Sequence, residues 1–147
     1  MMHNFTFPIH NSFKLNGINF NENELSHKAK HFIDEGKDFE REIGQFLLDW
    51  LNNNDFIELT TSGTTGKPKL IKIKKQAMVN SAIATGSFFN LTAGDKALLC
   101  LSTKYIAGKM MIVRALTIGL DLDIIAPSSH LDDLLPSTCY DFVAIVP

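Results

Sequence analysis

Three mainly apolar runs in the second half of the chain most strongly limit its fold. Each run follows a stretch that is expected to be helical, and the first of these stretches shows the apolar spacing that is typical of an amphipathic helix. The helices are expected at about 76–89, 110–118 and 131–135, and the strands at 96–101, 120–126 and 142–146. Strands that are apolar throughout are typical of parallel sheets, which helices cover. The alternation therefore predicts an α/β fold with a mostly parallel sheet flanked by helices.

An N-terminal β-hairpin is expected before this sheet. Asn16-Gly17 lies between two short β-type segments, 13–15 and 18–20. Asn-Gly in this setting is a strong signal for a two-residue hairpin turn, because both residues tolerate positive φ.

Two amphipathic helices are expected next. The first covers about 22–34 and ends at Gly36. The second runs from Asp38, the expected N-cap, to about Asn52, and its wide apolar stripe indicates core packing rather than a cofactor-binding surface. Short strands on either side of the polar segment that follows are expected at 56–59 and 70–74.

That polar segment, residues 60–69, reads Thr-Thr-Ser-Gly-Thr-Thr-Gly-Lys-Pro-Lys and offers no apolar side chain that could fill a core. Gly63 and Gly66 can adopt positive φ and let a ligand approach the backbone N–H groups, which form concave anion sites in such turns. The hydroxyl groups add donors, and the ammonium groups of Lys67 and Lys69 add positive charge that suits phosphate. The loop therefore predicts a polyphosphate ligand.

Two other interpretations of this loop remain open. A P-loop has four residues between its first glycine and the Gly-Lys-Ser/Thr that opens a helix. Here only Thr64 and Thr65 separate the glycines, and Pro68 follows Lys67 and disfavours a helix. An ordinary Ser/Thr/Gly-rich hairpin loop has a similar composition. The two lysines and five hydroxyl groups favour a binding role over that second alternative.

Residues 61–69 resemble the phosphate loop of the acyl-adenylate-forming (AMP-binding) superfamily, and they match every fixed position of its motif. The superfamily includes acyl-CoA synthetases, luciferases and peptide-synthetase adenylation domains. In it a carboxylate attacks the α-phosphate of ATP, pyrophosphate leaves, and a thiol, commonly that of coenzyme A, displaces AMP. The resemblance implies that the β- and γ-phosphates are held by Thr61, Ser62, Gly63, Thr64, Thr65, Gly66, Lys67 and Lys69.

A second candidate site follows the strand expected at 96–101. Ligands of parallel α/β sheets lie at the carboxyl ends of the strands. A carboxylate substrate is suited by an Arg or Lys and an aromatic wall. The segment after this strand resembles the family's acyl-pocket motif, in which an aromatic residue or histidine precedes a glycine. The candidate substrate-binding residues are Tyr105, Gly108, Lys109 and Arg114.

Within the superfamily, this segment most resembles the o-succinylbenzoate–CoA ligases of menaquinone biosynthesis. In those enzymes an Arg on the helix after the motif helps to hold the free carboxylate of the substrate, and Arg114 occupies the matching position. Ser102 and Thr103 depart from the Pro-containing version that is usual there. Two alternatives stay open: Arg114 paired with a nearby acid, and Lys109 as the solvated start of a helix.

Charge and composition argue against several other classes of function. The 14 Lys and Arg residues against 16 Asp and Glu give a net charge of −2, so no basic field invites nucleic acid. His27 and His31 share a helix face but lack a third metal ligand. Cys100 and Cys139 lie in apolar runs and are expected to be reduced core residues. No signal peptide or membrane-spanning run is evident, so a cytoplasmic location and no membrane partner are expected.

Three lysines after the loop form a small basic cluster: Lys72, Lys74 and Lys75. They could steer ATP towards the loop. The other interpretation is the solvated face of a strand and the start of a helix.

Residues 1–147 are expected to form a single domain, and the resemblance implies that this domain is incomplete. Members of the superfamily are considerably longer, and their ribose-binding acid, their glutamate for Mg²⁺ and their catalytic lysine come later in sequence. We therefore expect a fragment of an acid–CoA ligase that binds phosphates, is inactive alone, and self-associates through an apolar sheet edge. The alternative is a non-catalytic nucleotide- or phosphate-binding α/β module.

Overall fold

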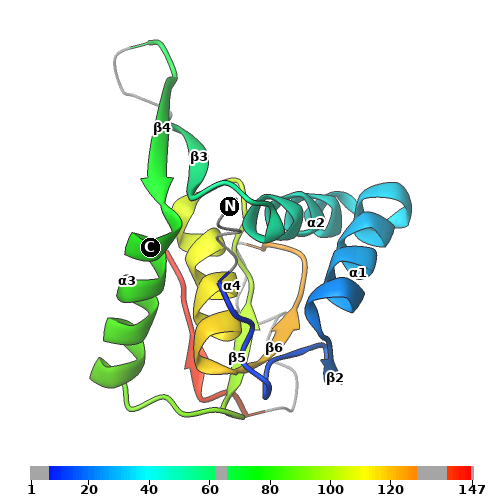
Figure 1. Cartoon of the computed structure of the whole chain (residues 1–147), viewed down its shortest axis with the longest axis vertical. Coiled ribbons are helices and arrows are strands. Elements are labelled where there is room, and N and C mark those ends of the chain that lie inside the picture. Colours follow the sequence, from blue (N-terminus) through cyan, green and yellow to red (C-terminus); the bar gives the residue numbers. More distant parts are fainter. Residues whose placement is uncertain (1–6, 62–65, 129–138, 147) are drawn as a thin grey trace, which may run out of the picture.

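The computed structural model describes residues 7–61, 66–128 and 139–146. Its main sheet has the strand order β2-β1-β6-β5-β7; β1 and β2 are antiparallel, and the other three pairs are parallel. The strands are β1 Lys14–Leu15, β2 Ile18–Asn19, β5 Lys96–Leu99, β6 Asp121–Ile124 and β7 Phe142–Val143. The helices are α1 Glu22–Glu35, α2 Asp38–Leu51, α3 Lys75–Phe88 and α4 Ile106–Ile118. The predicted α/β fold with a mostly parallel sheet is confirmed (Figure 1).

The N-terminal hairpin is confirmed, with its turn at the expected place. Asn16 and Gly17 have φ angles of 50° and 77°, the positive values that this kind of two-residue turn requires. The hairpin is tied to the main sheet through β1, which pairs with β6, and through the Asn16 side chain, whose Oδ1 accepts the Ile124 N–H at 3.0 Å.

The first two helices lie where their periodicity predicts, but the N-cap of the second differs from the predicted one. Asn21 and Glu24 form a reciprocal capping box at the start of α1, with two bonds of 2.9 Å. At the start of α2, Lys37 and not Asp38 is the N-cap. The reason is that the Glu40 carboxylate reaches back to accept the Lys37 N–H at 3.0 Å, which places Asp38 inside the first turn.

α4 begins four residues before the expected start at 110 and ends at Ile118 as predicted, with Gly119 in the left-handed region as its C-cap. Gly108 therefore lies in the first turn of α4 and not in a loop. A Cβ at this position would lie 2.2 Å from the Ser102 carbonyl oxygen, so only glycine lets the helix pack so closely on the segment that follows β5.

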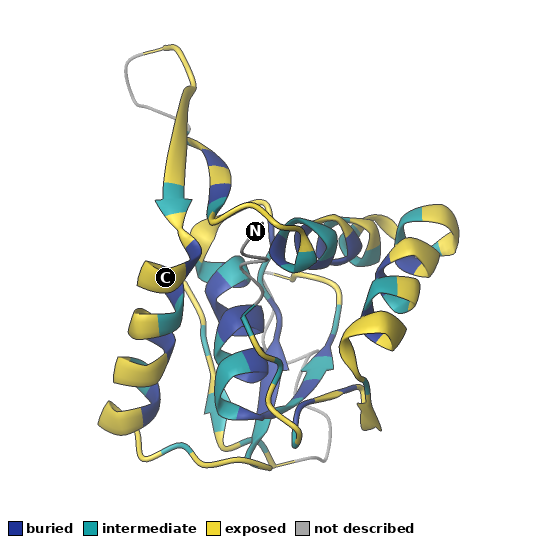
Figure 2. Ribbon diagram, viewed as in Figure 1, coloured by how far each residue is buried: buried dark blue, intermediate teal, exposed yellow. Residues whose placement is uncertain are grey.

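One hydrophobic core joins α2 and α4 to the sheet. Figure 2 shows the buried side of α4 facing the strands, with the exposed residues gathered on the outer surfaces of α1 and α3. The largest fully buried apolar side chains are Phe13, Phe46, Leu25, Leu47, Leu99, Met111, Ile112, Leu116, Leu120, Leu122 and Val113. No helix in the described part of the chain is long and apolar enough to cross a membrane.

The last predicted strand is wrong in length and in burial. β7 covers only Phe142–Val143, and the side chains of Ile145 and Val146 are exposed. β7 pairs with β5 alone and forms an edge of the described sheet, which leaves its outer side open. Cys139, just before β7, is likewise exposed and not a core residue, whereas Cys100 is buried as predicted. The short helix expected at 131–135 lies outside the described residues.

Candidate functional site

The described ends of the polar segment, residues 60–61 and 66–69, lie at the tip of a separate two-stranded hairpin that projects from the body of the molecule (Figure 1). β3 Phe56–Thr61 and β4 Lys69–Lys74 pair antiparallel over six residues each. Ile57 and Leu59 bury their side chains at the base, whereas β4 is mostly exposed. The predicted strand–loop–strand arrangement is therefore confirmed, and it excludes the strand-to-helix turn of a P-loop. Ser62, Gly63, Thr64 and Thr65 lie outside the described residues.

The described part of the hairpin tip is open to solvent. Gly66 has φ +100°, and a Cβ built on it would meet nothing within 4 Å. Lys67 and Lys69 are exposed, and neither forms an ion pair with another described residue. Thr61 Oγ1 lies 3.4 Å from the Lys69 carbonyl oxygen, across the last pair of the ladder. The tip thus presents positive charge and an accessible glycine backbone, which together suit a phosphate chain.

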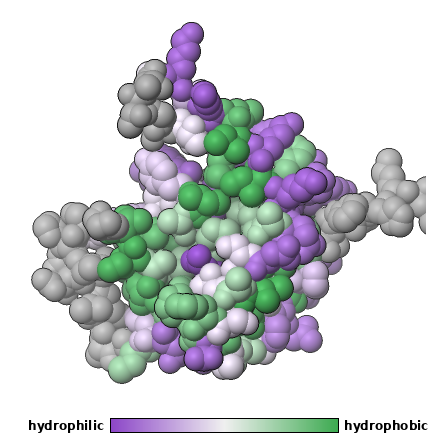
Figure 3. All heavy atoms as spheres, turned by 90° about the vertical axis from the view of Figure 1, so that its left-hand side faces the viewer, coloured by the Kyte–Doolittle hydropathy of each residue, from purple (hydrophilic) through white to green (hydrophobic). Residues whose placement is uncertain are grey.

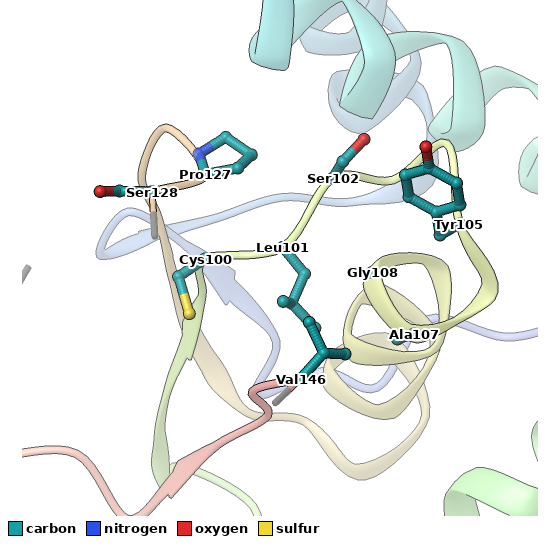
Figure 4. Close-up of a pocket in the computed structure, with 9 residues that line it drawn as sticks. All are labelled: Cys100, Leu101, Ser102, Tyr105, Ala107, Gly108, Pro127, Ser128 and Val146. Carbon is teal, nitrogen blue, oxygen red and sulfur yellow. The ribbon is translucent and has the colours of Figure 1, made fainter. Parts of the chain in front are cut away.

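A pocket of about 530 Å³ opens beyond the carboxyl ends of β5 and β6, where ligands of parallel α/β sheets are expected. Figure 4 shows it between the segment after β5, the segment after β6 and the first turn of α4. Its volume lies in the range of small-molecule sites, about 300–1,000 Å³. It is lined by Cys100, Leu101, Ser102, Tyr105, Ala107, Gly108, Pro127, Ser128 and Val146.

Two of the four predicted substrate residues, Tyr105 and Gly108, line this pocket. Tyr105 is 62% exposed and stands at the pocket mouth (Figure 4). Its ring also lines a second cavity of about 420 Å³, which lies between the hairpin and the start of α4. That cavity is lined by Glu58, Leu59, Thr60, Pro68, Lys104, Tyr105 and Lys109. Tyr105 is therefore the shared wall between the pocket and the space under the hairpin.

Lys109 lines the second cavity and not the pocket. Its ammonium group donates to the Thr103 carbonyl oxygen at 2.6 Å and lies 5.0 Å from the centre of the Phe46 ring. Burial lowers the pKa of Lys109, while the charges of Asp49 and Glu42 oppose that shift. The interpretation of Lys109 as a solvated helix start is therefore wrong, because its side chain is held inside the structure.

Arg114 is half-buried on α4 without an acidic partner among the described residues. Its Nε is buried and makes no hydrogen bond, and one terminal nitrogen lies 3.5 Å from Met111 Sδ. The guanidinium carbon lies 5.8 Å from the centre of the Phe142 ring. Burial lowers the pKa of Arg114. The interpretation of Arg114 as one half of an ion pair therefore finds no carboxylate in the described chain.

Arg114 lies on the same face of α4 as Ala107, which lines the pocket. Arg114 lies seven residues after the pocket residue Ala107, which at about 1.5 Å per residue is two helical turns, or roughly 10 Å. Arg114 is therefore not part of the pocket wall but lies farther along the helix.

Lys75 differs from its neighbours in the basic cluster because it is buried. The predicted solvated face is wrong for this residue, since its relative exposure is 0%. Its ammonium group donates to the Trp50 carbonyl oxygen at 3.0 Å and to the Asn52 carbonyl and side-chain oxygens at 3.1 and 3.0 Å. Burial lowers the pKa of Lys75, and the charges of Asp49 and Asp55 oppose this. No local signal distinguishes such a lysine from its exposed neighbours, because its acceptors lie more than twenty residues away.

His27 and His31 both lie on α1. His27 and His31 are exposed, and His31 lies 3.7 Å from the Glu35 carboxylate. Across residues 7–61, 66–128 and 139–146, no group of three His, Cys, Asp or Glu residues could hold a metal ion.

A parallel α/β sheet with a pocket at the carboxyl ends of its strands, together with a cationic Gly-containing hairpin, is an arrangement that suits a phosphate or nucleotide ligand. The profile of the AMP-binding enzyme family matches residues 21–145, most of the chain. The chain therefore belongs to the AMP-binding enzyme family.

Among solved structures, one relative above 30% identity agrees with this assignment. An acyl-CoA synthetase (AMP-forming)/AMP-acid ligase II-like protein from Dyadobacter fermentans is 32% identical, with a TM-score of 0.68 over 78% of this chain and 33% of its own. The o-succinylbenzoate coenzyme A synthetase of Bacillus subtilis, in complex with AMP, is 27% identical, with a TM-score of 0.47 over 52% of this chain and 20% of its own. The chain thus spans about a third of the first relative. No curated protein sequence gives a match.

Proposed function

We propose that residues 1–147 are the N-terminal part of the large domain of an ATP-dependent, AMP-forming acid–CoA ligase. The family assignment and the Dyadobacter fermentans relative, described as an acyl-CoA synthetase/AMP-acid ligase, support this. That relative extends well beyond the matched region, since the match covers 33% of it. The chain alone is accordingly proposed to bind nucleotide without completing a reaction.

The observation that carries the proposal is the exposed tip of the β3–β4 hairpin. Two ammonium groups, Lys67 and Lys69, have no anionic partner among the described residues and stand beside a glycine with open space around it. We assign residues 61–69 to the β- and γ-phosphates of ATP. The side chains of Thr61 and the lysines and the backbone near Gly66 supply the donors.

The acid substrate is assigned to the pocket beside Tyr105 and Gly108. Arg114, farther along α4, and Lys109, in the adjoining cavity, lie outside the pocket wall and are proposed to supply positive charge to it. An apolar wall with few polar groups suits the body of an organic acid. Arg114 supports a second carboxylate on the substrate, because its guanidinium is partly desolvated and unpaired with any described acid. A dicarboxylate with an aromatic body fits both features, and we propose o-succinylbenzoate, with coenzyme A as the second substrate. Magnesium accompanies ATP in such reactions, and no described residue is assigned to it.

The proposal is tested by titrating ATP into the purified chain in a calorimeter. The wild-type chain is expected to bind, and Lys67→Ala/Lys69→Ala is expected to bind about tenfold or more weakly, because two charge-assisted contacts are lost. Lys30→Ala, which removes an exposed lysine of α1, is the matched control and should bind like the wild type. Equal affinity in all three proteins would contradict the assignment of the hairpin.

Turnover separates the ligase fragment from a complete enzyme. Pyrophosphate release is measured with ATP and o-succinylbenzoate, and the chain alone is expected to release none. Clear release would show that this chain holds all the catalytic groups, and it would contradict the proposal that the chain is only part of a ligase.

A further inference from the structure

We propose that α2 is a rigid spacer that fixes the distance between the β3–β4 hairpin and the pocket loop, residues 100–105. Glu42 attaches α2 to the pocket loop and Lys75 attaches it to the hairpin, and both are positioning residues. This inference rests on the proposed function, because it concerns how the phosphate-binding hairpin and the acid-binding pocket are held at a fixed spacing. Neither residue is placed in contact with a ligand.

The first attachment joins α2 to the pocket loop through Glu42. One carboxylate oxygen accepts the Ser102 hydroxyl at 2.8 Å, and the other lies 3.4 Å from the Lys104 ammonium group. Ser102 Oγ in turn accepts the Lys104 N–H at 3.2 Å. Ser102 lines the pocket, and in Figure 4 its hydroxyl points away from the pocket towards α2. The position of Glu42 therefore determines where this part of the pocket wall lies.

A second contact supports the same attachment from inside. The Lys109 ammonium group lies over the Phe46 ring of α2 and donates to the Thr103 carbonyl oxygen. Thr103 is only 2% exposed, so the middle of the pocket loop is clamped between α2 and α4. The exposed Lys104 ion pair contributes little by itself, and the buried contacts are the ones that restrain the loop.

The other attachment joins the end of α2 to the base of the hairpin through Lys75. Lys75 directly follows Lys74, the last residue of β4, and its backbone N–H donates to the Asp55 carbonyl oxygen at 2.8 Å. Its three ammonium hydrogens are matched by three oxygens of Trp50 and Asn52, at the carboxyl end of α2, where the helix dipole favours a cation. Separating the two would leave a buried charge unpaired, which proteins strongly avoid.

Between these attachments α2 is a rigid rod. Ile43, Phe46, Leu47 and Trp50 bury their side chains in the core. Trp50 lies eight residues after Glu42, so the two attachments are separated by roughly 12 Å of continuous helix at about 1.5 Å per residue. One rod of fixed length therefore holds the phosphate-binding element and the acid-binding element at a set spacing, as orientation of two reactants requires.

The test is hydrogen exchange on the full chain, comparing the backbone amides of residues 100–105 with those of β3 and β4. Glu42→Ala is expected to speed exchange several-fold in the pocket loop and leave exchange in the hairpin unchanged. Lys75→Met is expected to speed exchange in the hairpin and leave exchange in the pocket loop unchanged. Should Lys75→Met fail to fold, Asn52→Ala removes one of the three acceptors and carries the same expectation. Arg41→Ala, an exposed residue of α2, is the control and should change neither segment.

A ligand arm gives a second readout. Glu42→Ala is expected to weaken o-succinylbenzoate binding and leave ATP binding unchanged, and Asn52→Ala is expected to weaken ATP binding only. A merely structural role would loosen both segments and weaken both ligands in either variant, and that result would overturn the proposal. If the wild-type chain binds neither ligand, the proposed function fails, while the exchange pattern still decides whether α2 sets the spacing.

Discussion

Arg114 holds a guanidinium group half-buried over the Phe142 ring, with a buried Nε that has no hydrogen-bond partner. A partly desolvated charge costs free energy unless an anion compensates it. No described carboxylate does so, and Arg114 lies on the same face of α4 as Ala107, which lines the pocket. At the scale of single residues, this unpaired cation is the clearest indication of an anionic substrate group.

Arg114→Met is expected to weaken the affinity for o-succinylbenzoate about tenfold or more, because one charge-assisted pair is lost. The melting temperature should not fall, because the substitution removes an uncompensated charge and keeps an apolar stem of similar length. Calorimetry and a thermal melt measure the two quantities. A lower melting temperature with unchanged acid binding would indicate a structural role instead.

Tyr140 gives a prediction about pH. Burial, the 2.8 Å hydrogen bond to Asp123 and the charges of Asp123 and Asp121 raise the pKa of Tyr140 to about 12. A raised pKa in the folded state adds stability that is complete below the usual value of about 10 and is lost as the pH rises towards 12. In a Tyr105→Phe background, Tyr140 is the single phenol, since the chain has two tyrosines.

Absorbance of the phenolate in that background checks this prediction. At about pH 11 Tyr140 should remain mostly protonated, and adding Asp123→Asn should lower its pKa and increase the phenolate fraction, although burial still holds the pKa above its usual value. Identical titration curves for the two proteins would contradict the role of Asp123. Circular dichroism at each pH keeps the comparison within the folded state.

At the scale of elements, the sequence predicts type and order well and predicts ends less well. The Asn16-Gly17 hairpin and the strands around the polar loop follow from local chemistry, and the structure confirms them. The start of α4 could not be predicted, because Gly108 normally signals a loop. Here it is required by a close approach to the Ser102 carbonyl, a contact that only the folded chain shows. Buried Lys75 escaped prediction for the same reason.

The close approach at Gly108 gives a prediction for α4. Gly108→Ala places a Cβ against the Ser102 carbonyl oxygen, so the helix or the pocket loop must shift. We expect a loss of about 1–3 kcal/mol in the free energy of unfolding, measured with urea. Ser87→Ala on the exposed face of α3 is the control and should stay within about 0.5 kcal/mol. An unchanged free energy of unfolding for Gly108→Ala would show that the pocket loop can shift at little cost, and it would contradict the prediction.

At the scale of the whole molecule, the body has apolar groups on its surface as well as in its core. Phe88 is 79% exposed, Phe89 and Val146 are more than half exposed, and Val143 on the edge strand β7 is partly open. Figure 3 shows hydrophobic residues spread over the face that includes α3. Exposed apolar residues beside an open strand edge favour association.

We therefore propose that the isolated chain forms homo-oligomers, and light scattering measures this directly. Phe88→Ser/Val146→Ser is expected to shift the population towards monomer without lowering the melting temperature, because both side chains are exposed. A wild-type chain that stays monomeric at high concentration would contradict this prediction.

The central claim is that the hairpin tip binds the phosphate chain of ATP, and residue-resolved NMR tests it most directly. On addition of ATP to the ¹⁵N-labelled chain, we predict saturable shifts of the amides of Thr61, Gly66, Lys67 and Lys69. The amides of the β1–β2 hairpin, at the far end of the sheet, should stay unchanged. Shifts confined to other parts of the chain, or no shift at all at saturating ATP, would contradict the claim.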